Sequence, residues 1–113
     1  MLAVLELQHP AMGDIALTDV LFALSDPSRL ALARQLVDGP MAMADCGAVG
    51  GPVPKATKSH QLKVLREAGV VRNVPRGRGR LLSLRREELD AAFPGLLDSV
   101  LGARAAAVDH KAN

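Results

Sequence analysis

The fold of this chain is best indicated by one stretch, residues 54–69, which reads PKATKSHQLKVLREAG. Its helical period turns Leu62 and Leu65 inward, and Gly69 is a typical helix stop. The remaining polar and basic side chains are expected on the outer faces of the helix. An α-helix fits the major groove of duplex DNA, and its N-terminal turn can reach base edges. The stretch therefore predicts a recognition helix over about 54–68.

A β-hairpin is predicted directly after this helix, over about 70–85. Val70 to Pro75 and Arg80 to Leu84 are short runs rich in Val and Leu, and the segment Arg76-Gly77-Arg78-Gly79 joins them. The hairpin tip is therefore an arginine loop. Contact with phosphate is favoured for these arginines over the alternative of solubility charges, because they gather at one tip.

Two helices are expected before the recognition helix. Asp14 is the predicted N-cap of the first, which should end near Ser25. Asp26 is the predicted N-cap of the second, with Pro27 at its first helical position, where a missing N–H costs nothing. The expected buried face of the first helix comprises Leu17, Val20, Leu21 and Leu24.

Glycine and proline mark the other boundaries. Gly39 should end the second helix, and a short helix from about Met41 to Cys46 should follow before a Gly- and Pro-rich turn. A last helical stretch is expected over about 86–107, and Pro94 should either kink it or begin a second helix. Its apolar stripe is formed by Leu89, Phe93, Leu96, Leu97, Val100 and Leu101.

Positive charge is concentrated in the middle of the chain. Residues 55–86 hold ten Lys or Arg and one acid, which gives +9, whereas residues 1–54 carry −4 and residues 87–113 carry −3. Such an asymmetry indicates one face that binds a polyanion. The only aromatic residues are Phe22 and Phe93, so platforms for stacking unpaired bases are lacking. Duplex DNA is therefore the favoured polyanion.

The order of short helix, turn, basic helix and arginine-tipped hairpin predicts a mainly α fold with a small β-hairpin wing, a winged helix-turn-helix. Two motifs, ALSDPSRL at 23–30 and ATKSHQLKVLREAGVV at 56–71, resemble the ArsR/SmtB family of bacterial repressors. The resemblance implies a homodimer whose recognition helices enter successive major grooves and whose repression is relieved, or occasionally reversed, by an effector. This chain departs from the family pattern at Pro54, where Ser or Thr is usual, and at Lys58, where an apolar residue is usual.

The sequence yields one domain, residues 14–107, between an N-terminal arm, 1–13, and a tail, 108–113. Apolar runs are too short to cross a bilayer, so a cytoplasmic protein without membrane contact is expected. The last helix and the first together exceed what so small a core can bury, which predicts a homodimer. The candidate DNA-contacting residues are Lys55, Thr57, Lys58, Ser59, His60, Gln61, Lys63, Arg76, Arg78 and Arg80.

An effector site is less well marked. His9, Asp109 and His110 lie at opposite ends of the chain, which a dimer could bring together as a nitrogen and oxygen site for nickel or zinc; mobile, unliganded termini are the alternative. Cys46 is the single cysteine and is expected in the core, and a redox- or metal-sensing thiol is the alternative. No catalytic motif is present, so an enzyme is not expected. The rival interpretation is a winged-helix adaptor or co-regulator without an operator of its own, which the +9 segment disfavours.

Overall fold

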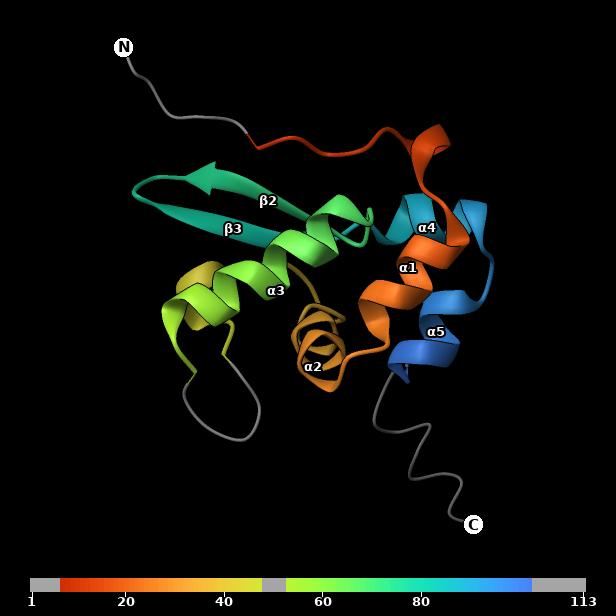
Figure 1. The fold of residues 1–113 in the computed structure, drawn as a ribbon. Helices are drawn as coiled ribbons and strands as arrows, with labels where there is room; N and C mark the ends of the chain where they lie inside the picture. The colour runs from red at the N-terminus through yellow and green to blue at the C-terminus, as the bar shows by residue number, and fades with distance from the viewer. Residues whose placement is uncertain (1–6, 48–52, 103–113) are drawn as a thin grey trace.

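The computed structural model describes residues 7–47 and 53–102. They form a helix-rich fold with a three-stranded antiparallel sheet, from which the hairpin projects as a wing (Figure 1). In chain order the elements are η1 Met12–Asp14, α1 Leu17–Leu24, α2 Pro27–Gln35, β1 Met41–Ala42, η2 Met43–Asp45, α3 Lys55–Glu67, β2 Val71–Arg76, β3 Gly79–Leu84, α4 Arg86–Ala92 and α5 Leu96–Leu101. The predicted winged helix-turn-helix is confirmed.

The predicted N-cap is wrong for α1 and correct for α2. Asp14 does not cap α1, because it belongs to η1 and Ala16 precedes the helix without a side-chain cap. Asp26 caps α2 as predicted: its Oδ2 accepts hydrogen bonds from the backbone N–H groups of Ser28, at 2.9 Å, and Arg29, at 3.1 Å. Helix α2 ends at Gln35, four residues before the predicted stop at Gly39.

The core lies where α1, α2, α3 and the sheet meet the last two helices. Val20 and Leu24 are buried as predicted, but Leu17 and Leu21 are 42% and 43% exposed, so the predicted buried face of α1 is only half covered within one chain. In the last stripe, Leu89, Leu97 and Leu101 are buried, and the other three members pack partly buried against the core.

The segment after α2 is the clearest correction to the predicted secondary structure. Instead of a helix over 41–46, it forms β1, which pairs antiparallel with β3 through Met41 and Leu82. The short 3-10 helix η2 follows. Strand β3 would otherwise leave one edge unpaired, and its backbone groups give this short segment partners that its own sequence does not reveal.

Helix α3 ends in the motif that its sequence predicts. Gly69 has φ +89°, and the backbone N–H groups of Gly69 and Val70 donate to the carbonyls of Arg66 and Leu65 in a Schellman arrangement. Leu62 and Leu65 are buried, as predicted. The chain then enters the wing, whose strands pair from Val71 with Leu84 to Arg76 with Gly79.

Pro94 separates two helices, which confirms one of the two predicted outcomes. It lies between α4 and α5, and Gly95, with φ +83°, precedes α5. Helix α5 ends at Leu101, before Gly102 with φ +76°, and residues 103–107 of the predicted helix lie outside the described residues. Among the described residues, no helix has the length and apolarity needed to cross a membrane.

Candidate nucleic-acid interface

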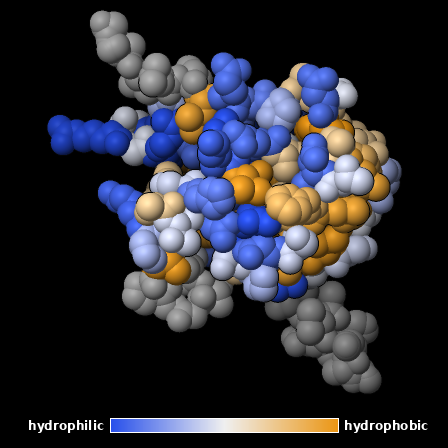
Figure 2. All heavy atoms as spheres, viewed as in Figure 1, coloured by the Kyte–Doolittle hydropathy of each residue, from blue (hydrophilic) through white to orange (hydrophobic). Residues whose placement is uncertain are grey.

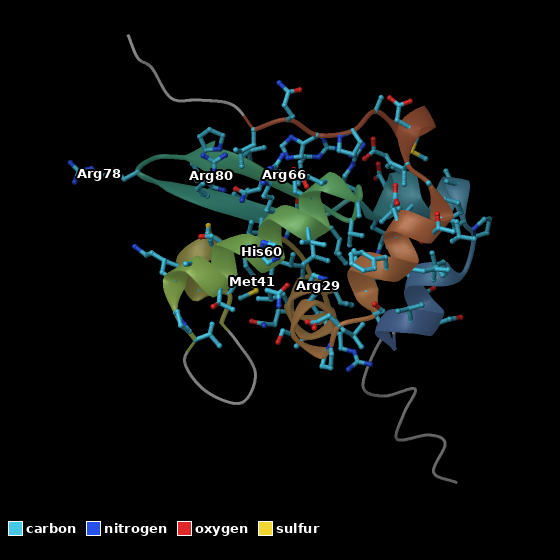
Figure 3. The ribbon with its side chains drawn as sticks, in the orientation of Figure 1. Arg29, Met41, His60, Arg66, Arg78 and Arg80 are labelled. Carbon is cyan, nitrogen blue, oxygen red and sulfur yellow. The ribbon has the colours of Figure 1, made fainter. Side chains whose placement is uncertain are left out.

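Helix α3 presents an exposed, polar N-terminal half. Pro54 offers no side-chain cap, yet the helix begins at Lys55 as expected, because the Pro54 carbonyl accepts the N–H groups of Thr57 at 3.0 Å and Lys58 at 3.1 Å. Most of the predicted contact residues on this helix have exposed side chains: Lys55, Thr57, Ser59, His60 and Lys63. Figure 3 shows His60 on α3, below the wing.

Two predicted contact residues on α3 are engaged within the protein. The Nζ of Lys58 donates to the carbonyl of Met43 at 2.6 Å, which fastens α3 to η2, the 3-10 helix within the segment predicted as the short helix before the turn. Gln61 accepts a hydrogen bond from Arg29 at 2.9 Å and points its amide nitrogen at Asp26, at 3.4 Å. The departure from the family pattern at position 58 therefore has a structural use.

Arg29 is a residue whose role the sequence analysis missed. Its side chain is buried, and its Nε and Nη2 donate to the carbonyls of Ala23 at 2.7 Å and Phe22 at 3.2 Å, while Nη1 holds Gln61. The guanidinium thereby satisfies carbonyls at the end of α1 and ties them to α3. The sequence offered one signal of this role. Arg29 lies in the first turn after the Asp26 cap, in a helix that otherwise packs into the core.

The wing tip presents two exposed arginines. Arg76 and Arg78 flank Gly77, whose φ of +59° suits the tight turn. Arg78 extends away from the tip (Figure 3). Arg80, also predicted to contact DNA, is half-buried instead, because its Nε and Nη2 donate to the Oδ1 and backbone carbonyl of Asn73 at 2.6 and 3.1 Å.

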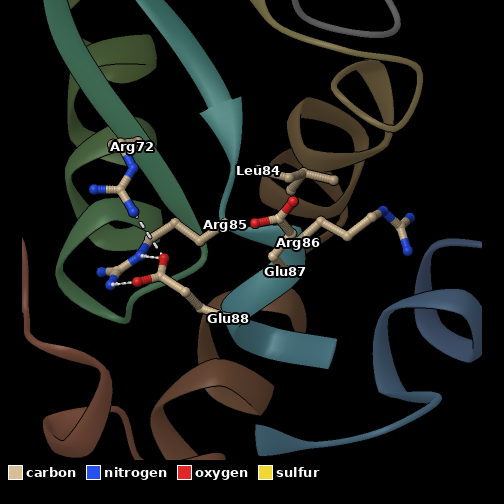
Figure 4. A pocket seen from close by; sticks show the side chains of 6 residues that line it. All are labelled: Arg72, Leu84, Arg85, Arg86, Glu87 and Glu88. Atoms are coloured by element: carbon tan, nitrogen blue, oxygen red, sulfur yellow. Dashed lines mark hydrogen bonds and ion pairs between the residues drawn. The ribbon is translucent and has the colours of Figure 1, made fainter. Parts of the chain in front are cut away.

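The base of the wing contains a second group of arginines, which are paired with a shared carboxylate. Arg85 is buried and donates to both carboxylate oxygens of Glu88, at 2.7 and 3.0 Å, and Arg72 reaches the same carboxylate at 2.7 Å (Figure 4). The hydrogen bond from Arg85 is the main reason that the pKa of Glu88 is lowered. These residues line an open pocket of about 580 Å³ between β2 and α4, whose cations are already paired.

Ten cations of the basic segment thus divide into two sets. Lys58, Arg66, Arg72, Arg80, Arg85 and Arg86 each make hydrogen bonds or ion pairs inside the protein. Within residues 7–47 and 53–102, no such partner is found for Lys55, Lys63, Arg76 or Arg78, and all four are exposed. A polyanion can be neutralised most directly by this second set.

His9 does not have the surroundings of a metal ligand in the described structure. Its Nε2 accepts the backbone N–H of Asn73 at 3.0 Å. Burial lowers the pKa of His9, and the positive charges of Arg66, Arg72 and Arg85 lower it further, so a cation would be repelled as well. Asp109 and His110 lie outside the described residues, and the described part of the chain holds no cluster of three or more His, Cys, Asp or Glu suited to a metal. The shared metal site stays a prediction.

Cys46 is fully buried, in agreement with the core role expected for it. Burial raises the pKa of its thiol, against a smaller opposing effect of Lys58. The thiolate, which is the form that binds metals and reacts with oxidants, is therefore disfavoured.

Comparison with known proteins identifies relatives along most of the chain. It is 38% identical over 80 residues to the HTH-type transcriptional regulator YceK of Bacillus subtilis, covering 69% of this chain and 79% of YceK. It is also 38% identical over 95 residues to the HTH-type transcriptional regulator NmtR of Mycobacterium tuberculosis, covering 84% of this chain and 73% of NmtR. No protein-family model matches the chain.

Comparison with solved structures also finds transcriptional regulators. One described as a possible transcriptional regulator for arsenical resistance superposes with a TM-score of 0.58 and 31% identity, over 72% of this chain and 82% of that one. The repressor BigR from Xylella fastidiosa gives a TM-score of 0.56 and 28% identity, over 74% and 83%. With this fold and these relatives, the protein is a DNA-binding transcriptional regulator and not an enzyme, and it belongs to the ArsR/SmtB family of winged helix-turn-helix regulators.

Proposed function

We propose that this regulator represses transcription by binding an operator with α3 in the major groove and the wing tip on the flanking phosphates. The division of the ten cations carries the proposal. The cations without partners in the described structure, Lys55, Lys63, Arg76 and Arg78, lie on the two elements that a winged helix-turn-helix directs at DNA. Ser59 and His60 are exposed between the two lysines, where they would meet base edges.

Salt dependence of duplex binding tests the proposal. Each neutralised phosphate contributes about −0.9 to the slope of log K against log salt. We expect a steep slope for the wild type and a shallower one for the double variant Lys63→Ala with Arg78→Ala, measured by fluorescence anisotropy on an operator duplex chosen from fragments bound by the protein. Arg34→Ala is the control and should keep the wild-type slope, because Arg34 lies on α2 and its Nε donates to the Leu101 carbonyl in α5. A slope near zero for the wild type would contradict the interface and favour the adaptor.

We also propose that the binding unit is a homodimer. Leu17 and Leu21, at 42% and 43% exposed, lie on α1 beside Phe22, which is 64% exposed. In Figure 2, hydrophobic side chains gather on the side of the molecule formed by α1 and α5, away from the wing tip. Burial of these side chains against a second copy would remove them from water. A folded monomer at micromolar concentration by light scattering would contradict the dimer.

The effector follows less directly from the described residues. A sulfur-rich site for an arsenical or a soft metal does not fit the chain, because its single cysteine, Cys46, is buried with a raised pKa. We still propose the nitrogen and oxygen set of His9, Asp109 and His110 for a nickel or zinc effector, and in that set His9 would exchange its hydrogen bond with the Asn73 N–H for the metal. Calorimetry with nickel and zinc on the wild type and on His110→Ala tests it. Binding that is absent, or unchanged by the substitution, would point to a small organic ligand or a partner protein instead.

A further inference from the structure

Three consecutive residues of the N-terminal arm accept hydrogen bonds from three elements of the DNA-binding unit. The carbonyl of Gln8 accepts from Arg66 at the end of α3, and the carbonyl of Pro10 accepts from buried Arg85 before α4, at 2.7 Å. Between them, the imidazole of His9 accepts the N–H of Asn73 in the middle of β2, at 3.0 Å. The arm runs along the β2 side of the wing (Figure 1).

The contact with Asn73 is made at the free edge of the sheet. The strand order β1-β3-β2 leaves β2 at an edge. Pro75 has no N–H and is tolerated where the strand faces away from its partner, so Asn73, two residues earlier, turns its N–H outward in the same direction. The Nε2 of His9 accepts the hydrogen bond from this outward N–H group. Asn73 in turn accepts two hydrogen bonds from Arg80, so an unbroken set of contacts runs from the arm across the wing to β3.

Ile15, which follows the arm, packs on the joint between α3 and the wing. Three residues separate the end of α3 from the start of β2, and the central one is Gly69. Ile15 packs so closely on it that a Cβ at Gly69 would lie 2.6 Å from the Ile15 Cγ1. The joint that sets the direction of the wing relative to α3 is therefore covered by Ile15, and arm residues 8–10 contact α3 and the wing on its two sides. Figure 3 shows Arg66 at that end of α3 and Arg80 on the wing.

We propose that residues 8–10 act as a strap that fixes the wing relative to α3, and that His9 is a positioning residue for DNA binding. The proposal rests on the interface proposed above, which needs the N-terminal turn of α3 and the wing tip to meet one duplex at the same time. Because the two parts are joined at Gly69, a wing released from the arm would place Arg76 and Arg78 on phosphates less often.

The test compares variants at position 9 in the full chain. His9→Phe keeps a ring but removes the acceptor, and His9→Gln restores one, because its amide oxygen lies about as far from the backbone as the imidazole Nε2. Gln8→Ala is the matched control, since the Gln8 side chain is exposed and only its carbonyl is used. Two measurements are made on each: amide hydrogen exchange of Asn73 by NMR, and the affinity and salt slope on one operator duplex.

We expect the Asn73 amide to exchange about tenfold faster in His9→Phe, the order of effect of one hydrogen bond. The salt slope of that variant should fall toward that of Arg78→Ala. His9→Gln should return both quantities to the wild-type values, and Gln8→Ala should change neither. If His9→Phe does not fold, His9→Ala replaces it. A purely stabilising role of His9 would change the unfolding midpoint and leave the salt slope of the folded protein unaltered.

Either of two results would overturn the strap: Asn73 exchange that is equal in the wild type and His9→Phe, or faster exchange with unchanged affinity and slope. Failure of the wild type to bind duplex DNA, with Asn73 protected by His9, is a different result. It would reject the proposed interface, and with it the positioning role that depends on that interface.

Discussion

Arginines lie at both the tip and the base of the wing, but those at the tip are exposed and those at the base are paired with a carboxylate. At the tip, Arg76 and Arg78 are exposed and have no partner among the described residues; at the base, Arg72 and Arg85 share the carboxylate of Glu88. Net charge counts both pairs alike, but only charges without partners can exchange counterions for phosphates at low cost. The difference shows that a basic segment is a mixture of binding charges and structural ones.

The largest effect expected from this comparison is on the stability of the wing base. Arg85→Ala removes a buried guanidinium, leaves the Pro10 carbonyl without its donor and leaves the Glu88 carboxylate with Arg72 alone. We expect a loss of about 2 to 3 kcal/mol in the free energy of unfolding, measured by urea denaturation. Arg78→Ala, the matched change at the tip, should alter stability by less than about 0.5 kcal/mol. Equal losses would remove the distinction between tip and base.

The same contrast applies along α3, between exposed and engaged polar side chains. Ser59→Ala or His60→Ala should change the preference between operator variants by about 1 to 3 kcal/mol, because these side chains are free to meet base edges. Gln61→Ala should instead lower stability by about 1 kcal/mol, since it removes the acceptor of the Arg29 Nη1, and should leave the order of preference unchanged. Competition binding with a set of single-base operator variants distinguishes the two results.

A smaller effect separates arginines of equal charge within the wing. Arg78→Ala should make the salt slope shallower by about 0.9 for each phosphate that the variant no longer neutralises. Arg72→Ala changes the net charge by the same amount, but its guanidinium is paired with Glu88, so the slope should remain that of the wild type. Anisotropy titrations at several salt concentrations measure both. A slope that changes equally in the two variants would show that net charge alone controls binding.

The smallest effect expected is a dependence of stability on acidic pH. The Arg85 and Arg72 partners hold the pKa of Glu88 below its ordinary value of 4.5 in the folded protein. A carboxyl with a lowered folded pKa stabilises the protein above the unfolded pKa, and that stabilisation is lost as the pH falls through the folded value. The wild type should therefore lose more stability than Glu88→Gln below about pH 4.5. Parallel urea midpoints for the two proteins over that range would contradict the assignment.

Local sequence determined the elements with strong signals of their own. Asp26 with Pro27 starts α2, Gly69 ends α3, and the Val- and Leu-rich runs around the arginine loop form the hairpin within about one residue of the predicted limits. Capping, helix termination and tight turns depend on neighbours within a few residues, so the chain itself contains what decides them.

The remaining elements and contacts depend on tertiary packing, because their partners lie far apart in sequence. Strand β1 exists because β3 offers an edge, and the carboxylate that neutralises Arg72 follows 16 residues later. His9 meets Asn73 across 64 residues, a contact that no periodicity or spacing encodes. Sequence alone placed the positive charge in one segment, whereas folding determined which of those charges remain available for DNA.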